Sequence, residues 1–225
     1  MISRRSAAIA LAIVIPAPSI GALVSFWIAP GTIGIAVYAL CKAVLYLTPA
    51  IWSRWVDGER WKVSGFGKNG WGIGIGVGVA VGVLVVLTRW LLGDRAIDMN
   101  TFHGVLNENG LSTPAKFVVA ALWLSFVNSL LEEYVFRWFI TSRFEAITPR
   151  WATWLSASAF TLHHVIVLAK YLPVPTTVLA SIGIFVGGLI WSWLYRRSGC
   201  IWPSWASHVL VDLAIMGVGY VALFG

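Results

Sequence analysis

Long apolar runs separated by short polar breaks make up most of this 225-residue sequence. A bilayer core about 30 Å thick is crossed by roughly 20 apolar residues in an α-helix. Seven runs approach that length, at about 7–28, 32–52, 70–92, 116–140, 152–169, 176–194 and 204–224. The pattern predicts an all-α fold, a polytopic transmembrane helix bundle of about seven spans, which forms one integral membrane domain over residues 1–225.

Proline and glycine shape the first three runs. Pro16 and Pro18 predict a kink or break near the middle of the first span. The short break at 29–31 predicts an antiparallel hairpin with the second span. The third run alternates glycine with aliphatic residues like a strand, but a lone strand cannot satisfy its backbone in lipid. As a helix it carries a stripe of small residues for close packing: Gly70, Gly74, Gly78 and Gly82.

The basic residues predict the orientation of the bundle. With the N-terminus in the cytoplasm, the inside segments hold Arg4, Arg5, Arg54, Arg60, Lys62, Lys68, Arg137, Arg143, Arg150, Arg196 and Arg197. The outside segments hold Arg89, Arg95, Lys116 and Lys170, together with the acidic Asp94, Asp98 and Glu108. This asymmetry follows the positive-inside rule and predicts N-in and C-out. Lys42 lies within the second span, and we assign it no role from the sequence.

Composition excludes two broad classes of protein. Charged residues make up only 11% of the chain, against about 25% in a soluble domain, so the bilayer is the expected partner. The net charge of +7 is spread between apolar runs rather than clustered, which argues against nucleic acid. The two cysteines, Cys41 and Cys200, are expected to be free thiols.

Ionisable residues inside the fourth span carry candidate chemistry, because such groups are costly in lipid and mark functional sites. Glu133 and Arg137 lie about 40° apart on a helical wheel, which predicts an i,i+4 ion pair. Glu132 lies about 140° from Arg137 on the same wheel. It therefore needs another partner or a proton, and it is a candidate general base.

Histidines in the fifth and seventh spans add to this set. His208 and Asp212 lie at i,i+4 on one helical face, where the carboxylate can orient the imidazole. At about 1.5 Å per residue, Glu132, His164 and His208 all fall in the cytoplasmic half of the bilayer. His163 points about 100° away from His164, so we expect it to pack or to line the access path.

Three short motifs in order resemble those of a known family. Glu132-Glu133-x-x-x-Arg137, Phe160-x-x-x-His164 and His208-x-x-x-Asp212, each in its own span, are similar to the motifs of the CPBP intramembrane proteases. This family is also described as CAAX protease and bacteriocin-processing, ABI or Rce1-type. The resemblance covers about 116–225 and marks it as the catalytic helical core. The N-terminal helices of 1–115, three spans and an outer loop, match only in being helical and apolar.

The resemblance implies peptide-bond hydrolysis within the membrane, near its cytoplasmic side. Glu132 and His164 would activate a water, and His208 would stabilise the oxyanion. Glu133 and Arg137 would support the geometry of the site or contact the substrate.

Asp212 departs from the Asn of the prenyl-protein members of the family. An ionised Asp cannot donate to an oxyanion. The resemblance therefore leaves two roles open for Asp212: it would act in a protonated form, or it would support the site by fixing His208.

We favour a site without a cofactor, and zinc stays the alternative. The sequence holds no His-Glu-x-x-His motif. Glu132, His164 and His208 could nevertheless form a three-ligand zinc site with an open water position. A metal-free water site needs the same residues.

Two other functions compete with the endopeptidase: a non-enzymatic membrane immunity or scaffold protein, and a proton-coupled transporter. Transporters usually carry inverted repeats, whereas the ionisable groups here gather in the fourth, fifth and seventh spans. We expect a peptide or protein substrate, which could be membrane-anchored, and the sequence leaves C-terminal tails, leader peptides and sorting tails open. The expected location is the plasma (inner) membrane of a prokaryote.

Overall fold

The computed structural model describes residues 2–58, 65, 69–93, 99–108 and 111–225. Within these ranges the chain is helical without strands. Seven helices are long and apolar enough to cross a membrane: Arg4–Ile28, Thr32–Val56, Trp71–Leu92, Pro114–Ile147, Ala152–Tyr171, Val174–Ser198 and Trp202–Phe224. The predicted all-α bundle of seven spans is confirmed. The orientation stays a prediction, and six residues used for it lie outside the described ranges: Arg60, Lys62, Lys68, Asp94, Arg95 and Asp98.

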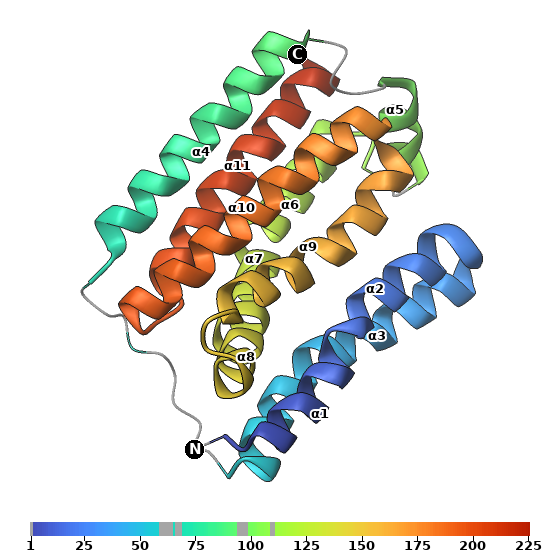
Figure 1. Ribbon diagram of the computed structural model, residues 1–225. Coiled ribbons are helices and arrows are strands. Elements are labelled where there is room, and N and C mark those ends of the chain that lie inside the picture. The colour runs from blue at the N-terminus through green and yellow to red at the C-terminus, as the bar shows by residue number, and fades with distance from the viewer. Residues whose placement is uncertain (1, 59–64, 66–68, 94–98, 109–110) are drawn as a thin grey trace.

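The first span is divided where the prolines predict. Helix α1 (Arg4–Val14) meets α2 (Pro16–Leu23) at Ile15, because a proline at the second segment's first position cannot donate its backbone hydrogen bond. A π-helical turn, η1 (Val24–Ile28), follows α2. After a turn at Gly31, where φ is 101°, helix α3 (Thr32–Ile51) returns along α2 and ends in a second π-helical turn, η2 (Trp52–Val56). The predicted hairpin is therefore present (Figure 1).

Helix α4 (Trp71–Leu92) lies along α11 (Trp202–Phe224), which is the last span (Figure 1). Gly74, Gly78 and Gly82 are its buried positions. A Cβ added at Gly78 would stand 2.9 Å from the Cα of Ser207 on α11, so the helices approach too closely for a larger residue. The glycine stripe predicted from the sequence thus packs against the helix that carries His208.

The fourth span is longer than its apolar run. It is continuous from α6 (Pro114–Leu122) through η4 (Trp123–Asn128), α7 (Ser129–Glu132) and η5 (Glu133–Thr141) to α8 (Ser142–Ile147). The prediction ended this span at residue 140, since Arg143 interrupts the apolar pattern. The helix continues because Arg143 is buried and its Nη2 lies 2.5 Å from Oδ2 of Asp57, beyond the second span.

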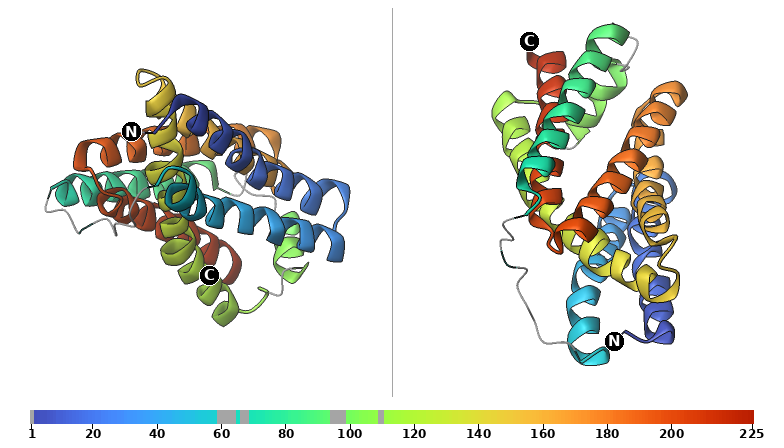
Figure 2. Two further views of the ribbon diagram at one scale, coloured as in Figure 1. Left: turned by 90° about the horizontal axis from the view of Figure 1, so that it is seen from below. Right: turned by 60° about the vertical axis from the view of Figure 1, so that its left-hand side comes forward.

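The remaining helices complete the bundle. Helices α9 (Ala152–Tyr171) and α10 (Val174–Ser198) pack side by side. Helix α5 (Met99–Glu108) lies in the segment predicted as an outer loop, and its Leu106 is buried. The hairpin of α1 to α3 lies against α8 and α9, whereas α4 lies against α11 (Figure 1 and Figure 2).

Candidate active site

Glu133 is fully buried, and one of its oxygens joins two spans. Its Oε1 lies 3.4 Å from Nε of Arg137 and 3.0 Å from Nδ1 of His208. The i,i+4 pair predicted from the sequence is present. Because an ionised carboxylate only accepts hydrogen bonds, Nδ1 of His208 donates to it. The contact fixes the imidazole on α11 relative to the fourth span.

Arg137 extends this cluster to the fifth and sixth spans. It is completely buried, and its Nη1 donates to the hydroxyl of Ser192 at 3.1 Å. The guanidinium lies 4.8 Å from the ring centroid of Phe160 and 5.7 Å from that of Trp191, within the range of cation–π attraction. Ser192 and Trp191 could not be predicted as members of the site, since neither lies near a motif along the chain.

Glu132 is also buried, at 5% exposed, but its environment differs from that of Glu133. The side-chain amide of Asn128 donates to its Oε1 at 2.8 Å. Its Oε2 lies 3.8 Å from Nε2 of His208. The partner that the sequence left open is thus a neutral amide four residues earlier on the same helix.

His164 meets Glu132 from the fifth span. Nδ1 of His164 lies 2.8 Å from the backbone oxygen of Phe160. A carbonyl only accepts, so Nδ1 carries the proton and Nε2 of the neutral ring holds the lone pair. Ligand atoms of Glu132, His163 and His164 all lie within 4.8 Å of one another. The structure therefore brings Glu132 and His164 together, as the resemblance implies.

His163 also reaches this group, which the sequence did not predict. Its ring packs on Phe136 with centroids 5.5 Å apart and planes 16° apart, in line with the packing role we expected. Its centroid also lies 4.0 Å from that of His164. His163 is therefore a packing residue that belongs to the site as well.

The donor set that the described residues bring together differs from the predicted zinc set. It holds His163 in place of His208, whose Nδ1 is engaged by Glu133. Two imidazoles and a carboxylate are the ligand chemistry of a catalytic zinc site, so the residues fit such an ion chemically. The donor atoms of a tetrahedral zinc site lie about 2 Å from the ion and roughly 3.3 Å from one another. The ligand atoms of Glu132, His163 and His164 lie within 4.8 Å of one another, which is a wider limit.

The ring of His208 is held on its face as well as its edge. Trp191 stacks on it with centroids 3.9 Å apart, and the indole Nε1 donates to Ser207 at 3.1 Å. Nε2 of His208 lies 3.7 Å from Oδ1 of Asp212. The i,i+4 contact predicted between these two residues is present, and the Asp212 side chain is 21% exposed.

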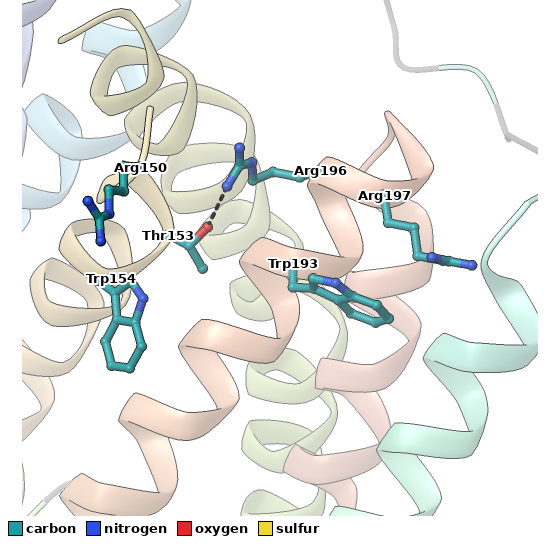
Figure 3. A pocket seen from close by; sticks show the side chains of 6 residues that line it. All are labelled: Arg150, Thr153, Trp154, Trp193, Arg196 and Arg197. Carbon is teal, nitrogen blue, oxygen red and sulfur yellow. Dashed lines mark hydrogen bonds between the residues drawn. The ribbon is translucent and has the colours of Figure 1, made fainter. Parts of the chain in front are cut away.

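Two cavities of similar size lie away from these motifs. One, of about 550 Å³, is lined by three arginines, a threonine and two tryptophans at the ends of α9 and α10 (Figure 3). The other, of about 530 Å³, lies between α4 and the end of α10, where Gly70 and Ser198 line it. Neither is lined by a motif residue.

Comparison with known proteins gives one match. Residues 114–214 match the model of the Rce1-like family, described as type II CAAX prenyl endopeptidase Rce1-like. No curated protein and no solved structure matches the chain. The matched segment begins with α6 and ends within α11, so it contains all three motifs and the contacts among them. The match supports a protease embedded in the membrane, and residues 114–214 are similar to the Rce1-like family, which agrees with the resemblance that the motifs carry.

Proposed function

We propose that this chain is an intramembrane endopeptidase in which Glu132 and His164 activate a water for attack on a peptide carbonyl. The unequal environment of two adjacent carboxylates carries the proposal. Glu133 is paired with Arg137 and His208, whereas Glu132 accepts from the neutral amide of Asn128. The imidazole of His208 lies farther from Glu132 than from Glu133, with Nε2 3.8 Å from Oε2 of Glu132, so the Glu132 carboxylate is the less strongly engaged of the two and is suited to take a proton as a general base.

In the proposed reaction, the water lies between Glu132 and Nε2 of His164. The lone pair of Nε2 accepts one hydrogen of the water, and Glu132 takes the other as the oxygen attacks the carbonyl carbon. The carbonyl electron pair moves onto its oxygen. The oxyanion then re-forms the C=O bond as the C–N bond breaks, and Glu132 passes its proton to the leaving nitrogen, which restores the carboxylate.

His208 is the proposed oxyanion donor. Since Nδ1 donates to Glu133, Nε2 carries a proton only in the imidazolium form, and that form donates to an oxyanion. Asp212 acts through His208 as a nearby counter-charge, because an ionised carboxylate has no proton to donate. Glu133 and Arg137 support the site by holding His208 and the spans in register.

Zinc remains the alternative catalytic type. Held by Glu132, His163 and His164, the ion would supply a more acidic water as the nucleophile. Glu132 and His164 belong to both catalytic types, so the two types are separated by experiment.

We further propose that the scissile bond is presented near the cytoplasmic side of the plasma membrane of a prokaryote. The N-in orientation expected from the basic residues supports this side. The family description names CAAX prenyl endopeptidases, which favours C-terminal tails over leader peptides as substrates.

The test is cleavage of prenylated C-terminal peptides and leader peptides by the purified full chain in lipid vesicles. Glu132→Gln and His164→Ala should each lower kcat by roughly 10²–10⁴-fold, the usual contribution of a general base. Glu145→Gln and His103→Ala are matched controls, since both residues are partly exposed outside the motifs. Full activity of both motif variants would refute the catalytic assignment of Glu132 and His164, whereas a native protein that cleaves none of these peptides would favour a scaffold or transporter. Loss of native activity with a chelator, regained with zinc, would favour the metal.

A further inference from the structure

A line of hydrogen bonds runs from the second span to Glu132. Nζ of Lys42 donates to Oη of Tyr46 at 3.1 Å, and Oη donates to Oδ1 of Asn128 at 3.2 Å. Nδ2 of Asn128 then donates to Oε1 of Glu132 at 2.8 Å. Lys42 and Tyr46 lie in α3, Asn128 in η4 and Glu132 in α7. The line therefore joins the second span, which lies outside the family match, to the fourth span, which lies within it.

The direction of each bond in this line follows from its two ends. An ionised Glu132 only accepts, so Asn128 must present its NH2 to Glu132 and its carbonyl to Tyr46. The phenol must then donate to that carbonyl, which leaves its lone pairs for Lys42. The Lys42 ammonium only donates, so each hydrogen bond between Lys42 and Glu132 has one donor and one acceptor.

Lys42 is fixed at the start of the line by its surroundings. Its Nζ lies 5.5 Å from the ring centroid of Tyr38 and 5.3 Å from that of Tyr46, within cation–π range. A cation inside a spanning helix needs such partners because it is costly in lipid. The line also fixes which oxygen of Glu132 is engaged, since Oε1 accepts from Asn128 and Oε2 faces His208.

We propose that Lys42, Tyr46 and Asn128 are positioning residues that hold the Glu132 carboxylate with Oε2 turned to the reacting water. This inference rests on the proposed function and extends its machinery into the N-terminal helices. None of the three residues touches the substrate. Their effect is on the orientation of the general base, so they should act on kcat rather than on KM.

The test is a double-mutant cycle on the purified full chain, with Lys42→Met and Tyr46→Phe alone and together. Each single variant should lower kcat about tenfold, below the roughly 100-fold that a 1 Å misplacement can cause, with KM and thermal unfolding unchanged. The double variant should be no slower than either single variant, because one broken link interrupts the whole line. Lys42→Arg should regain part of the lost rate, and Lys116→Met, on an exposed lysine, should match the native protein.

Additive effects of the two substitutions, or native kcat in both variants, would overturn the positioning role of the line. The proposed function would still hold if Glu132→Gln is inactive. Native activity of Glu132→Gln would instead overturn the proposed function. A change in KM alone would show that Lys42 binds substrate, which also contradicts a positioning role.

A second feature, independent of the motifs, is the arginine-lined cavity of Figure 3. Arg150 lies before α9, and Arg196 and Arg197 lie at the end of α10, so three arginine residues line the cavity at one end of two neighbouring spans, with the guanidinium of Arg197 5.6 Å from the ring centroid of Trp193. Arg196 bonds to Thr153 at 3.1 Å and pairs with Glu145 at 2.7 Å. One carboxylate therefore offsets part of the charge of three cations.

The apolar part of the cavity lies beside its cationic rim. The indoles of Trp154 and Trp193 are 50% and 46% exposed, which leaves both open to contact. In Figure 3 they lie on the side of the arginines toward the middle of the helices. A cationic rim next to an aromatic wall at a span's end has the two chemistries of a phospholipid, an anionic head and an acyl chain.

We infer that this cavity binds the phosphate group of an anionic phospholipid. The probes are phosphatidylglycerol, phosphatidylcholine and inorganic phosphate, added to delipidated protein and followed by native mass spectrometry and thermal unfolding. Phosphatidylglycerol should bind in preference to the other two. Arg150→Gln with Arg197→Gln should weaken that binding about fivefold for each arginine lost.

The control removes two charges elsewhere, with Arg4→Gln and Arg5→Gln, both exposed in α1, and it should leave the preference unchanged. Equal binding of the two lipids, binding of inorganic phosphate with no preference for lipid, or an equal loss in the control would each overturn the inference.

Discussion

Two buried arginines on the fourth span serve different regions of the molecule. Arg137 pairs with Glu133 four residues earlier on its own helix, inside the motif region. Arg143 pairs with Asp57, which lies 86 residues away at the end of the N-terminal hairpin. Ser6 and Ser53 complete the second cluster, with bonds to Asp57 and to Arg143. One arginine thus organises the site, and the other fastens the hairpin that carries Lys42 against it.

The comparison shows what each kind of pair does. A pair within one helix acts on the side chains around it. Here Glu133 contacts His208, and Arg137 contacts Ser192. A long-range pair sets the distance between two parts of the chain. The motif region therefore contains its own chemistry, whereas the position of the N-terminal hairpin depends on a contact outside every motif.

Arg137→Met should produce the largest effect. It leaves the Glu133 carboxylate buried with a lost charge partner, and breaking a buried pair in this way costs about 3–5 kcal/mol. We expect a lower free energy of unfolding in detergent and no measurable proteolysis. A variant that unfolds like the native protein would show that the pair does not stabilise the motif region.

Arg143→Gln and Asp57→Asn should each cost about 2–3 kcal/mol, because each removes a buried ion pair between the two residues and leaves the other charge in place. The double variant should lose less free energy of unfolding than the two single variants lose together, since both charges are then removed. Denaturant unfolding of all three variants measures this coupling. Purely additive losses would contradict the latch between the hairpin and α8.

The same pair predicts an effect on the hydrogen-bond line to Glu132. If the latch sets the position of the hairpin, the Arg143→Gln variant should lose kcat by up to about tenfold while KM stays constant. A native kcat in a destabilised Arg143→Gln protein would separate the latch from the line. The activity assay described above measures both constants.

Gly78→Leu should have a smaller effect than the loss of the buried Arg137 pair. The new side chain would press on the Ser207 backbone of α11, and overpacking of this kind costs about 1–3 kcal/mol. Gly76→Leu is the matched control, since nothing lies within 4 Å of a Cβ added there. Equal thermal unfolding of the two variants would contradict the close contact between α4 and the helix of His208.

The sequence by itself determined the seven spans, the break at the prolines, the hairpin and the glycine stripe. It also determined the motifs, because each of them is a spacing of five or fewer residues along one helix. Glu133 with Arg137 and His208 with Asp212 could be paired on that basis. The spacing of two residues within a helix fixes the directions in which their side chains point. These contacts can therefore be predicted without the positions of the neighbouring spans.

Contacts between spans could not be predicted in the same way. The approach of His163 to Glu132, the stacking of Trp191 on His208 and the line from Lys42 depend on how the helices turn toward one another. Apolar surfaces pack in many rotations with similar energy, and lipid tails do not distinguish among them. The polar contacts between helices select one arrangement, and they become visible only when the bundle is assembled. The tertiary structure therefore decided which partner from another span each buried charge receives, as Ser192 for Arg137 and His208 for Glu133. Asn128 lies four residues before Glu132 on the same helix, so its spacing alone could have predicted that contact.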